Sequence, residues 1–254
     1  MPGTVGRLKR FYIPPQELNS PAPSLKGAEA VHAARVLRMK AGNRVELFDG
    51  RGRSVDAEIT AVRREEVSLK LSGLPRLDPA PKTEIVLAPS LIRWEKMKTV
   101  LQKGVELGVS RIWPFESGRS VAQSNDASPE GFTERSRRVL VEAMKQCGEN
   151  RLPEVTAPAN LRQTLAHAYP GWLKLFLWEG ETGMGLREIA EAGANPEGVI
   201  IAVGPEGGFS DDEAEMARSM GYTMASMGRR ILRAETAAIA AVAIAQYTWG
   251  DLGS

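Results

Sequence analysis

A proline-rich segment, residues 73–81, divides this 254-residue sequence into two parts with different patterns. Prolines at positions 75, 79 and 81 fix the backbone and remove hydrogen-bond donors, so we expect a stiff connector there and neither a strand nor a helix. The charge also changes sign. Residues 1–78 hold 14 Lys and Arg against 9 Asp and Glu, whereas the rest holds 19 against 22. We therefore expect one domain over residues 1–76 and a second over residues 82–254.

The first part carries short runs of β-forming residues separated by glycine-bearing turns. The runs cover residues 9–13, 44–48, 54–62 and 66–71, and one helical stretch, about residues 27–37, interrupts them. Short strands at this spacing predict a small barrel or sandwich. The excess of positive charge is compatible with a surface for nucleic acid, and equally with an ordinarily solvated basic surface.

In the second part, strands and helices alternate. Apolar runs predict strands over residues 84–88, 111–115, 173–178, 199–203 and 222–226. Helical patterns cover residues 94–107, 129–146, 161–167, 211–220 and 236–249. Ser210 and Glu213 have the spacing of a capping box at the start of one helix. This alternation predicts an α/β fold with a mainly parallel sheet covered by helices.

The cysteine and histidine content narrows the possible chemistry. Cys147 is the single cysteine and the sequence has two histidines, so neither an intrachain disulfide nor a Cys/His zinc cluster is expected. The longest apolar stretch, residues 237–245, is too short to span a bilayer, and no signal peptide is readable at the start. We expect a cytoplasmic protein with no bound metal and no membrane contact.

A glycine-rich loop follows the predicted strand at residues 199–203. Residues 204–209 read Gly-Pro-Glu-Gly-Gly-Phe and lead into the capped helix. Ligands of open parallel sheets bind beyond the carboxyl ends of strands, and glycines let the backbone approach a ligand closely. The spacing matches neither a Walker motif nor a dinucleotide-binding motif. A plain glycine turn into a helix is the alternative.

The loop after the next strand, residues 227–236, sets Ile231 and Leu232 among arginines. An exposed turn does not require two aliphatic residues, so we expect a pocket that packs a flat adenine beside an anionic polymer. The helix that follows is apolar nearly all round, which predicts contact with the sheet on one side and with a second subunit on the other. Burial inside a monomer is the competing explanation.

These two loops, together with several separated motifs, resemble the bacterial 16S ribosomal RNA (uracil-N3)-methyltransferases of the SPOUT superfamily. The matching segments are residues 10–11, 32–38, 47–50, 102–109, 142–143, 146–148, 204–208 and 228–237. The resemblance implies an N-terminal PUA-like β-barrel that binds RNA, followed by a SPOUT α/β trefoil-knot domain. It also implies a homodimer that transfers a methyl group from S-adenosylmethionine to N3 of one uridine in 16S rRNA, within the small ribosomal subunit.

Methyl transfer to uracil requires alignment of the donor with the nucleophile and a means of handling the N3 proton. Removal of that proton leaves negative charge on the flanking carbonyl oxygens, and a fixed guanidinium would stabilise it. Arg233 is the candidate, because we expect it at the mouth of the proposed cofactor loop. Pairing with Glu235 or binding to phosphate is an equal alternative for Arg233. Glu206 is the candidate proton acceptor, with capping of backbone amides as its alternative.

The remaining candidates fall into two groups. For the methyl donor we expect Glu179, Gly204, Gly207, Met227, Gly228, Ile231 and Leu232. For RNA we expect Arg10, His32, Arg35, Arg38 and Arg151. His32, Arg35 and Arg38 recur every three residues, which places them along one face of the predicted helix. Relatives often carry a basic residue where this chain has Glu149, which weakens the expectation of phosphate binding at Arg151.

Two other functions stay open on the sequence alone. Many SPOUT relatives methylate ribose 2′-hydroxyl groups, and digestion of methylated RNA to nucleosides separates a modified base from a modified sugar. A catalytically silent RNA-binding protein that assists ribosome assembly is the second, and absence of donor binding would favour it.

Overall fold

The computed structural model describes residues 7–120, 128–167, 169–179, 184–193 and 195–252. The chain forms two compact units. The first comprises Met1–Ala80 and Met144–Leu152, and the second comprises Pro81–Ala143 and Pro153–Ser254. The units are therefore not two consecutive segments, because residues 144–152 pack with the first unit although the chain on both sides of them belongs to the second.

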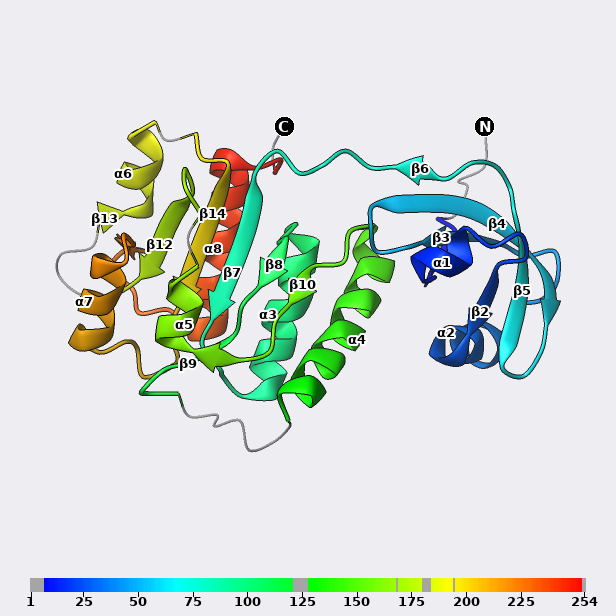
Figure 1. The fold of residues 1–254 in the computed structure, drawn as a ribbon, viewed down its shortest axis with the longest axis horizontal. Helices are drawn as coiled ribbons and strands as arrows, with labels where there is room; N and C mark the ends of the chain where they lie inside the picture. Colours follow the sequence, from blue (N-terminus) through cyan, green and yellow to red (C-terminus); the bar gives the residue numbers. More distant parts are fainter. Residues whose placement is uncertain (1–6, 121–127, 168, 180–183, 194, 253–254) are drawn as a thin grey trace. The chain divides into compact units, whose positions relative to one another are not determined.

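The first unit is built on a six-stranded sheet (Figure 1). The strands are, in spatial order, β1 (Lys9–Tyr12), β3 (Arg44–Phe48), β4 (Arg53–Val62), β5 (Glu66–Leu71) and β2 (Ser24–Lys26), with β6 (Arg76–Leu77) paired to β4. β1 runs parallel to β3, and the other pairs are antiparallel. A register shift between Ile59 and Ala61 in β4 is the kind of irregularity that bends a strand.

Three short helices complete the core of this unit: α1 (Pro15–Leu18), α2 (Gly27–Val31) and η1 (His32–Val36). Leu18, Ala30 and Ala33 from these helices pack in one apolar cluster with strand residues such as Phe11 and Leu47. The predicted strands are present. Burial of one side of the sheet under the helices explains the alternation of apolar and polar residues along β3 and β4.

Two local predictions for this unit are wrong. The proline-rich connector contains the strand β6, because Arg76 and Leu77 lie between prolines and keep the N–H groups needed to pair with Ser54 and Arg53. The helix predicted over residues 27–37 changes from α to π geometry at His32 and ends at Val36. Arg38 therefore lies outside it, with φ +52°.

The turn between β3 and β4 explains the Leu-Phe-Asp-Gly motif at residues 47–50. The Asp49 carboxylate is buried, and its Oδ1 atom accepts hydrogen bonds from the backbone N–H of Arg51 at 2.8 Å and of Arg53 at 3.1 Å. Gly50 and Gly52 have φ values of +75° and +88°, which other residues rarely adopt. The motif is thus the sequence of one tight turn.

Residues 144–152, the end of helix α4 (Pro129–Cys147) and the turn after it, pack on this β3–β4 turn. The backbone N–H of Gly52 donates to the carbonyl oxygen of Asn150 at 2.9 Å. The backbone N–H of Leu152 donates to the carbonyl oxygen of Gly50 at 3.0 Å. A Cβ atom at Gly52 would lie 2.8 Å from the Arg151 guanidinium carbon. Any other residue at position 52 would displace this guanidinium and would also be strained by the φ of +88°, so glycine is favoured there.

The second unit is built on a seven-stranded sheet in which every pair of neighbours is parallel. The strands are, in spatial order, β10 (Glu154–Val155), β8 (Arg111–Ile112), β7 (Glu84–Pro89), β14 (Gly198–Val203), β12 (Leu173–Leu177), β15 (Thr223–Ser226) and β13 (Met184–Gly185). A second, two-stranded sheet pairs β9 (Phe115–Glu116) with β11 (Ala159–Asn160). The predicted mainly parallel sheet is confirmed.

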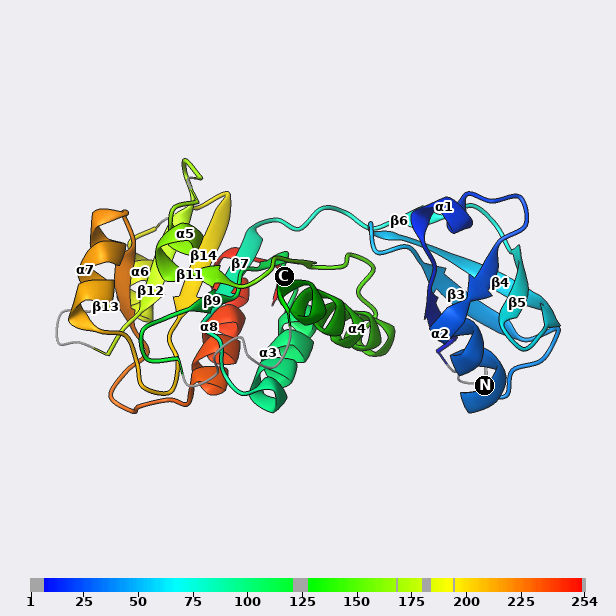
Figure 2. The ribbon, with the colours of Figure 1, turned by 60° about the horizontal axis from the view of Figure 1, so that its bottom comes forward.

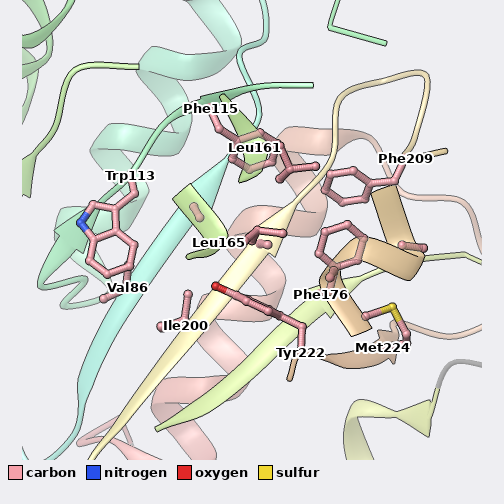
Figure 3. Packing of buried hydrophobic residues seen from close by; sticks show 14 residues of the cluster. Val86, Trp113, Phe115, Leu161, Leu165, Phe176, Ile200, Phe209, Tyr222 and Met224 are labelled. Atoms are coloured by element: carbon pink, nitrogen blue, oxygen red, sulfur yellow. The ribbon is translucent and has the colours of Figure 1, made fainter. Parts of the chain in front are cut away.

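Helices lie on both faces of this sheet (Figure 2). α8 (Ala234–Trp249) contacts β7, β14 and α3 (Trp94–Glu106) on one face. The other face carries α5 (Leu161–Leu165) and α7 (Asp211–Ser219), and α6 (Leu186–Glu191) contacts β13 and β15. In Figure 3, Val86, Ile200 and Phe176 from three adjacent strands gather with Leu161 of α5. Alternate residues of these strands point to the opposite face, toward α8.

Most predicted elements of this unit are present, and the capping box of α7 is confirmed. The Ser210 hydroxyl accepts from the Glu213 backbone N–H at 3.2 Å, and the Glu213 carboxylate accepts from the Ser210 N–H at 2.8 Å. The strand predicted over residues 111–115 is instead divided into β8 and β9, since Pro114 between them has no N–H to donate. In the part of the chain that the structure describes, no helix is long and apolar enough to cross a membrane.

Candidate functional site

Three loops at the carboxyl edge of the second unit's sheet enclose a cavity of about 190 Å³. Parallel pairing brings the loops together, because Leu177 at the end of β12 lies beside Val203 of β14 and Ala225 of β15. All three side chains line the cavity. The loops that follow them are residues 178–179, 204–209 and 227–233, two of which are the loops singled out in the sequence. Beyond residue 179 the first loop lies outside the described residues.

Six of the seven residues predicted for the methyl donor line this cavity. They are Glu179, Gly204, Gly207, Met227, Gly228 and Leu232. The seventh, Ile231, is 82% exposed and does not line it. Of the aliphatic pair, only Leu232 is therefore brought to the cavity.

The glycines of the 204–209 loop have distinct structural reasons. A Cβ atom at Gly204 would lie 3.0 Å from the Phe209 ring, which is buried and stacks on Phe176 with ring centroids 3.9 Å apart. A Cβ atom at Gly207 would lie 3.3 Å from Cβ of Arg119, and Gly208 has φ +66°. The loop is therefore a closely packed wall of the cavity and more than a plain turn.

Arg119 is a residue that the sequence analysis missed. It lines the cavity, and its Nη1 atom donates to the carbonyl oxygens of Gly207 at 3.1 Å and Phe209 at 3.3 Å. It lies in the loop after β9, which is held in place by the backbone N–H of Gly118 donating to Glu213 at 2.9 Å. A basic residue just beyond a strand's carboxyl end was the available signal.

Three serine hydroxyls anchor the same loop to the end of strand β7. The buried Ser90 hydroxyl lies 2.8 Å from that of Ser120 and 3.3 Å from that of Ser117. Ser120 also accepts from the Ser117 backbone N–H at 3.0 Å. These contacts tie the loop that carries Arg119 to the end of β7.

The two predicted catalytic residues lie at the start of α8 and in the glycine loop, and neither lines the cavity. Arg233 is the exposed N-cap residue of α8. The Glu206 carboxylate accepts a hydrogen bond from Nζ of Lys96 at 2.9 Å. This bond lowers the pKa of Glu206, which makes its carboxylate a weaker proton acceptor. The Glu235 carboxylate lies 3.7 Å from the same Lys96 nitrogen.

Of the residues predicted to bind RNA, Arg10 is buried in the first unit. Its guanidinium forms an ion pair with Glu46 at 3.0 Å and donates to the carbonyl oxygens of Met144 and Glu149 and to the side-chain oxygen of Asn150. Its side chain is 2% exposed. The described structure thus assigns Arg10 to holding residues 144–150 on the sheet, with no free guanidinium face for a phosphate.

Arg151 is also engaged inside the first unit. Its Nη2 atom donates to the carbonyl oxygen of Asp78 at 2.7 Å. The Glu149 carboxylate accepts from the backbone N–H groups of Asn150 at 2.7 Å and of Arg151 at 2.6 Å. Glu149 therefore holds the turn after α4, which gives this unusual acidic residue a structural role.

The other three RNA candidates are closer to solvent. Arg35 and Arg38 are exposed and His32 is half-buried, with its ring edge-on to Phe11 at 6.1 Å. Because the helix ends at Val36, the three do not share one regular helix face as predicted. They remain neighbours in sequence on one short segment of the first unit.

Comparison with known proteins agrees with this architecture. The family described as RNA methyltransferase domain matches residues 78–246, and the RNA methyltransferase PUA domain family matches residues 25–72. Ribosomal RNA small subunit methyltransferase E of Mesomycoplasma hyopneumoniae is 34% identical over 177 residues, which is 69% of this chain and 73% of that protein.

Two solved structures match nearly the whole chain. A putative methyltransferase of Legionella pneumophila, solved with bound S-adenosylmethionine, is 31% identical with a TM-score of 0.88, covering 96% of this chain and 99% of that chain. Ribosomal RNA small subunit methyltransferase E of Neisseria gonorrhoeae, also bound to S-adenosylmethionine, is 28% identical with a TM-score of 0.87, covering 97% and 100%.

These likenesses confirm the predicted fold, a PUA-like β-barrel followed by a SPOUT α/β trefoil-knot domain with a mainly parallel sheet. The family match extends over most of the chain, and one relative exceeds 30% identity over most of its length. The chain therefore belongs to the RNA methyltransferase family that includes ribosomal RNA small subunit methyltransferase E.

Proposed function

We propose that this chain is an enzyme that uses S-adenosylmethionine to methylate N3 of one uridine in 16S rRNA. The observation that carries the proposal is the cavity at the carboxyl edge of the sheet, walled by the 204–209 and 227–233 loops. It belongs to a chain that matches two methyltransferases solved with this donor over nearly their full length. The (uracil-N3) specificity rests on the sequence resemblance.

The residues of the cavity suit this donor. Leu177, Val203 and Leu232 offer apolar surface for an adenine ring. At Gly228, with φ +95°, no atom lies within 4 Å of where a Cβ would stand, so the backbone leaves open space. Glu179 adds a carboxylate that can accept hydrogen bonds from ribose hydroxyls or pair with the donor's ammonium group. When bound, the donor supplies a methyl group on a positively charged sulfur.

The chain's own residues orient the nucleophile and stabilise charge. Arg233, exposed where α8 begins, is positioned to stabilise the carbonyl oxygens that flank a deprotonated uracil N3. Arg230, from the same loop, lines the cavity and adds a second guanidinium. Glu206 stays in this proposal as the acidic partner of Lys96, since its lowered pKa suits a fixed negative charge better than a proton acceptor.

RNA is the proposed macromolecular partner, recognised in part by the first unit. His32, Arg35 and Arg38 are its proposed contacts, since their side chains are at least partly accessible. Guanidinium groups bind phosphates through charge and multiple donors. We also propose that the rRNA is methylated within the small ribosomal subunit and that the protein acts in the cytoplasm.

A homodimer is proposed through helix α8. The helix buries Ala238, Ala241 and Ala245 against its own unit, yet it leaves Ile244 and Tyr247 exposed, the latter by 74%. These two residues are three positions apart and share one face of the helix. Sedimentation of the unsubstituted chain should give a dimer, and Tyr247→Glu should shift it toward the monomer. A monomeric unsubstituted chain would contradict this part of the proposal.

The function is tested by incubating the protein with methyl-labelled S-adenosylmethionine and 16S rRNA from cells that lack the modification. Naked rRNA and assembled small subunits are offered separately, and the RNA is digested to nucleosides. We expect label in 3-methyluridine. Label on a ribose 2′-hydroxyl, or donor binding without any transfer, would overturn the proposed reaction.

A further inference from the structure

Lys96 connects three separate parts of the second unit through its ammonium group. It lies in the first turn of α3, and its Nζ atom is 2.9 Å from Oε1 of Glu206 and 3.7 Å from Oε2 of Glu235. Glu206 is in the middle of the glycine loop, whereas Glu235 is in the first turn of α8. The three side chains are partly shielded, with exposed fractions of 30%, 30% and 17%.

Each carboxylate is joined by the backbone directly to residues that line the cavity. Pro205 and Gly207 flank Glu206, and Ala234 precedes Glu235. A movement of either carboxylate away from Lys96 would therefore move a wall of the cavity. The two contacts join residues far apart in sequence, and they connect the glycine loop and the start of α8 to the same helix, α3.

The charges around Lys96 explain why a cation is needed there. Two carboxylates converge on its nitrogen, and without it they would repel each other. Oε2 of Glu235 is buried and accepts no hydrogen bond from any described residue. The hydrogen bond to Glu206 raises the pKa of Lys96 and lowers that of Glu206, while Arg93 also favours the Glu206 carboxylate and Arg233 opposes the charge on Lys96.

We propose that Lys96 is a positioning residue that holds the glycine loop and the start of α8 in the arrangement that binds the methyl donor. The inference rests on the proposed function, because it assigns the cavity to S-adenosylmethionine. Lys96 does not line the cavity, so it acts through Glu206 and Glu235.

The test replaces Lys96 by methionine and measures S-adenosylmethionine binding by calorimetry. We expect Lys96→Met to bind roughly tenfold more weakly, as for loss of one charged contact, and Lys96→Arg to stay within about threefold of the unsubstituted chain. The matched control is Lys103→Met, on the same helix. Among the described ion pairs, Lys103 pairs only with Glu106 of the same helix, at 2.7 Å. Its replacement should therefore leave the affinity for S-adenosylmethionine unchanged.

A second substitution separates positioning from general stability. If repulsion between the carboxylates displaces the two walls, then Lys96→Met combined with Glu235→Gln should recover most of the lost affinity. A carboxyl NMR titration without donor should also show the pKa of Glu206 rising in Lys96→Met. These two readouts do not depend on turnover, and circular dichroism checks that each variant is folded.

The outcomes distinguish this inference from the proposed function. Absence of donor binding by the unsubstituted chain would overturn the proposed function and this inference with it. Normal binding by the unsubstituted chain together with unchanged affinity in folded Lys96→Met would overturn the inference alone. If Lys96→Met fails to fold, Glu206→Gln takes its place, because it also removes the charged contact with Lys96; an unchanged affinity in folded Glu206→Gln would decide against the inference.

Discussion

The guanidinium of Arg119 donates a hydrogen bond to the carbonyl oxygen of Gly207 at 3.1 Å, and so joins the loop after β9 to the wall of the cavity. A second hydrogen bond from the Arg119 guanidinium, to the carbonyl oxygen of Phe209 at 3.3 Å, holds the end of the 204–209 loop. Arg119→Met removes both charged hydrogen bonds. We expect donor affinity to fall roughly tenfold while the fold is kept, as measured by calorimetry.

The control for this substitution is Arg187→Met. Arg187 lies on α6, pairs with Glu191 at 3.4 Å and does not line the cavity. Both variants lose one positive charge, so net charge is matched. Equal affinities for the two variants would show that Arg119 does not shape the donor site.

Gly228 and Gly221 make a matched pair for testing the cavity. They have φ values of +95° and +80°, and neither has an atom within 4 Å of where a Cβ would stand. Gly228 lines the cavity and Gly221, at the end of α7, does not. Each change to tryptophan carries a similar backbone cost of about 1–3 kcal/mol. Gly228→Trp should abolish donor binding and Gly221→Trp should preserve it; the reverse pattern would place the donor elsewhere.

Arg10 is expected to stabilise the first unit. Arg10→Met leaves Glu46 and Asn150 without their buried cation and should lower the free energy of unfolding by about 3–5 kcal/mol. Arg44→Met, which removes an exposed ion pair with Asp56, should cost about 1 kcal/mol or less. Chemical denaturation measures both, and a similar small cost for both variants would argue against a structural role for Arg10.

RNA binding by the first unit is tested by replacing Arg35 and Arg38 together with glutamine. Loss of two phosphate contacts should weaken binding and reduce the slope of log affinity against log salt by roughly two. The control replaces Arg63 and Arg64, two exposed arginines near the β4–β5 turn of the same unit. An identical effect from the control pair would mean that only overall charge matters.

The Lys96–Glu206 contact predicts a defined dependence of stability on pH. The folded-state pKa of Glu206 lies below the ordinary value of 4.5, so its contribution is present above that pH and lost as pH falls through the folded-state value. The pKa of Lys96 is raised above 10.5, so its contribution is lost only at still higher pH.

The melting temperature of Glu206→Gln should therefore lie slightly below that of the unsubstituted chain at pH 7, and the two should converge in acid. The difference is small because both side chains are partly exposed to solvent. A difference that grew as the pH fell below 4.5 would contradict the assigned direction.

The sequence predicted the parts of this fold that depend on local pattern. Runs of apolar residues located the buried strands β7, β12 and β14, and the Ser210–Glu213 spacing located the start of α7. It also located both glycine-containing walls of the cavity. The π-helical turn at His32 was missed because it has no residue signature. The break at Pro114 was missed although the proline is visible in the sequence, and the separate pairing of its two halves, β8 with β7 and β9 with β11, appears only in the folded chain.

The residue roles that the sequence did not predict depend on contacts between distant positions. Lys96 is one of several lysines in α3, and only the folded chain brings it to Glu206, 110 positions later. Arg10 belongs to one of the motifs in the sequence, yet nothing near it in sequence indicates that its guanidinium donates hydrogen bonds to residues 144–150. Residue type identified candidates, whereas burial and partners separated structural arginines from accessible ones.

The inclusion of residues 144–152 in the first unit constrains how the chain can be dissected or recombined. A fragment ending at residue 80 would lack residues 144–152. These residues accept hydrogen bonds from the Arg10 guanidinium and form backbone hydrogen bonds with the Gly50–Gly52 turn. Transplanting this barrel onto another enzyme would require two crossovers in the gene instead of one. Modular exchange at the proline connector alone is thereby disfavoured, and the two halves are expected to be inherited together.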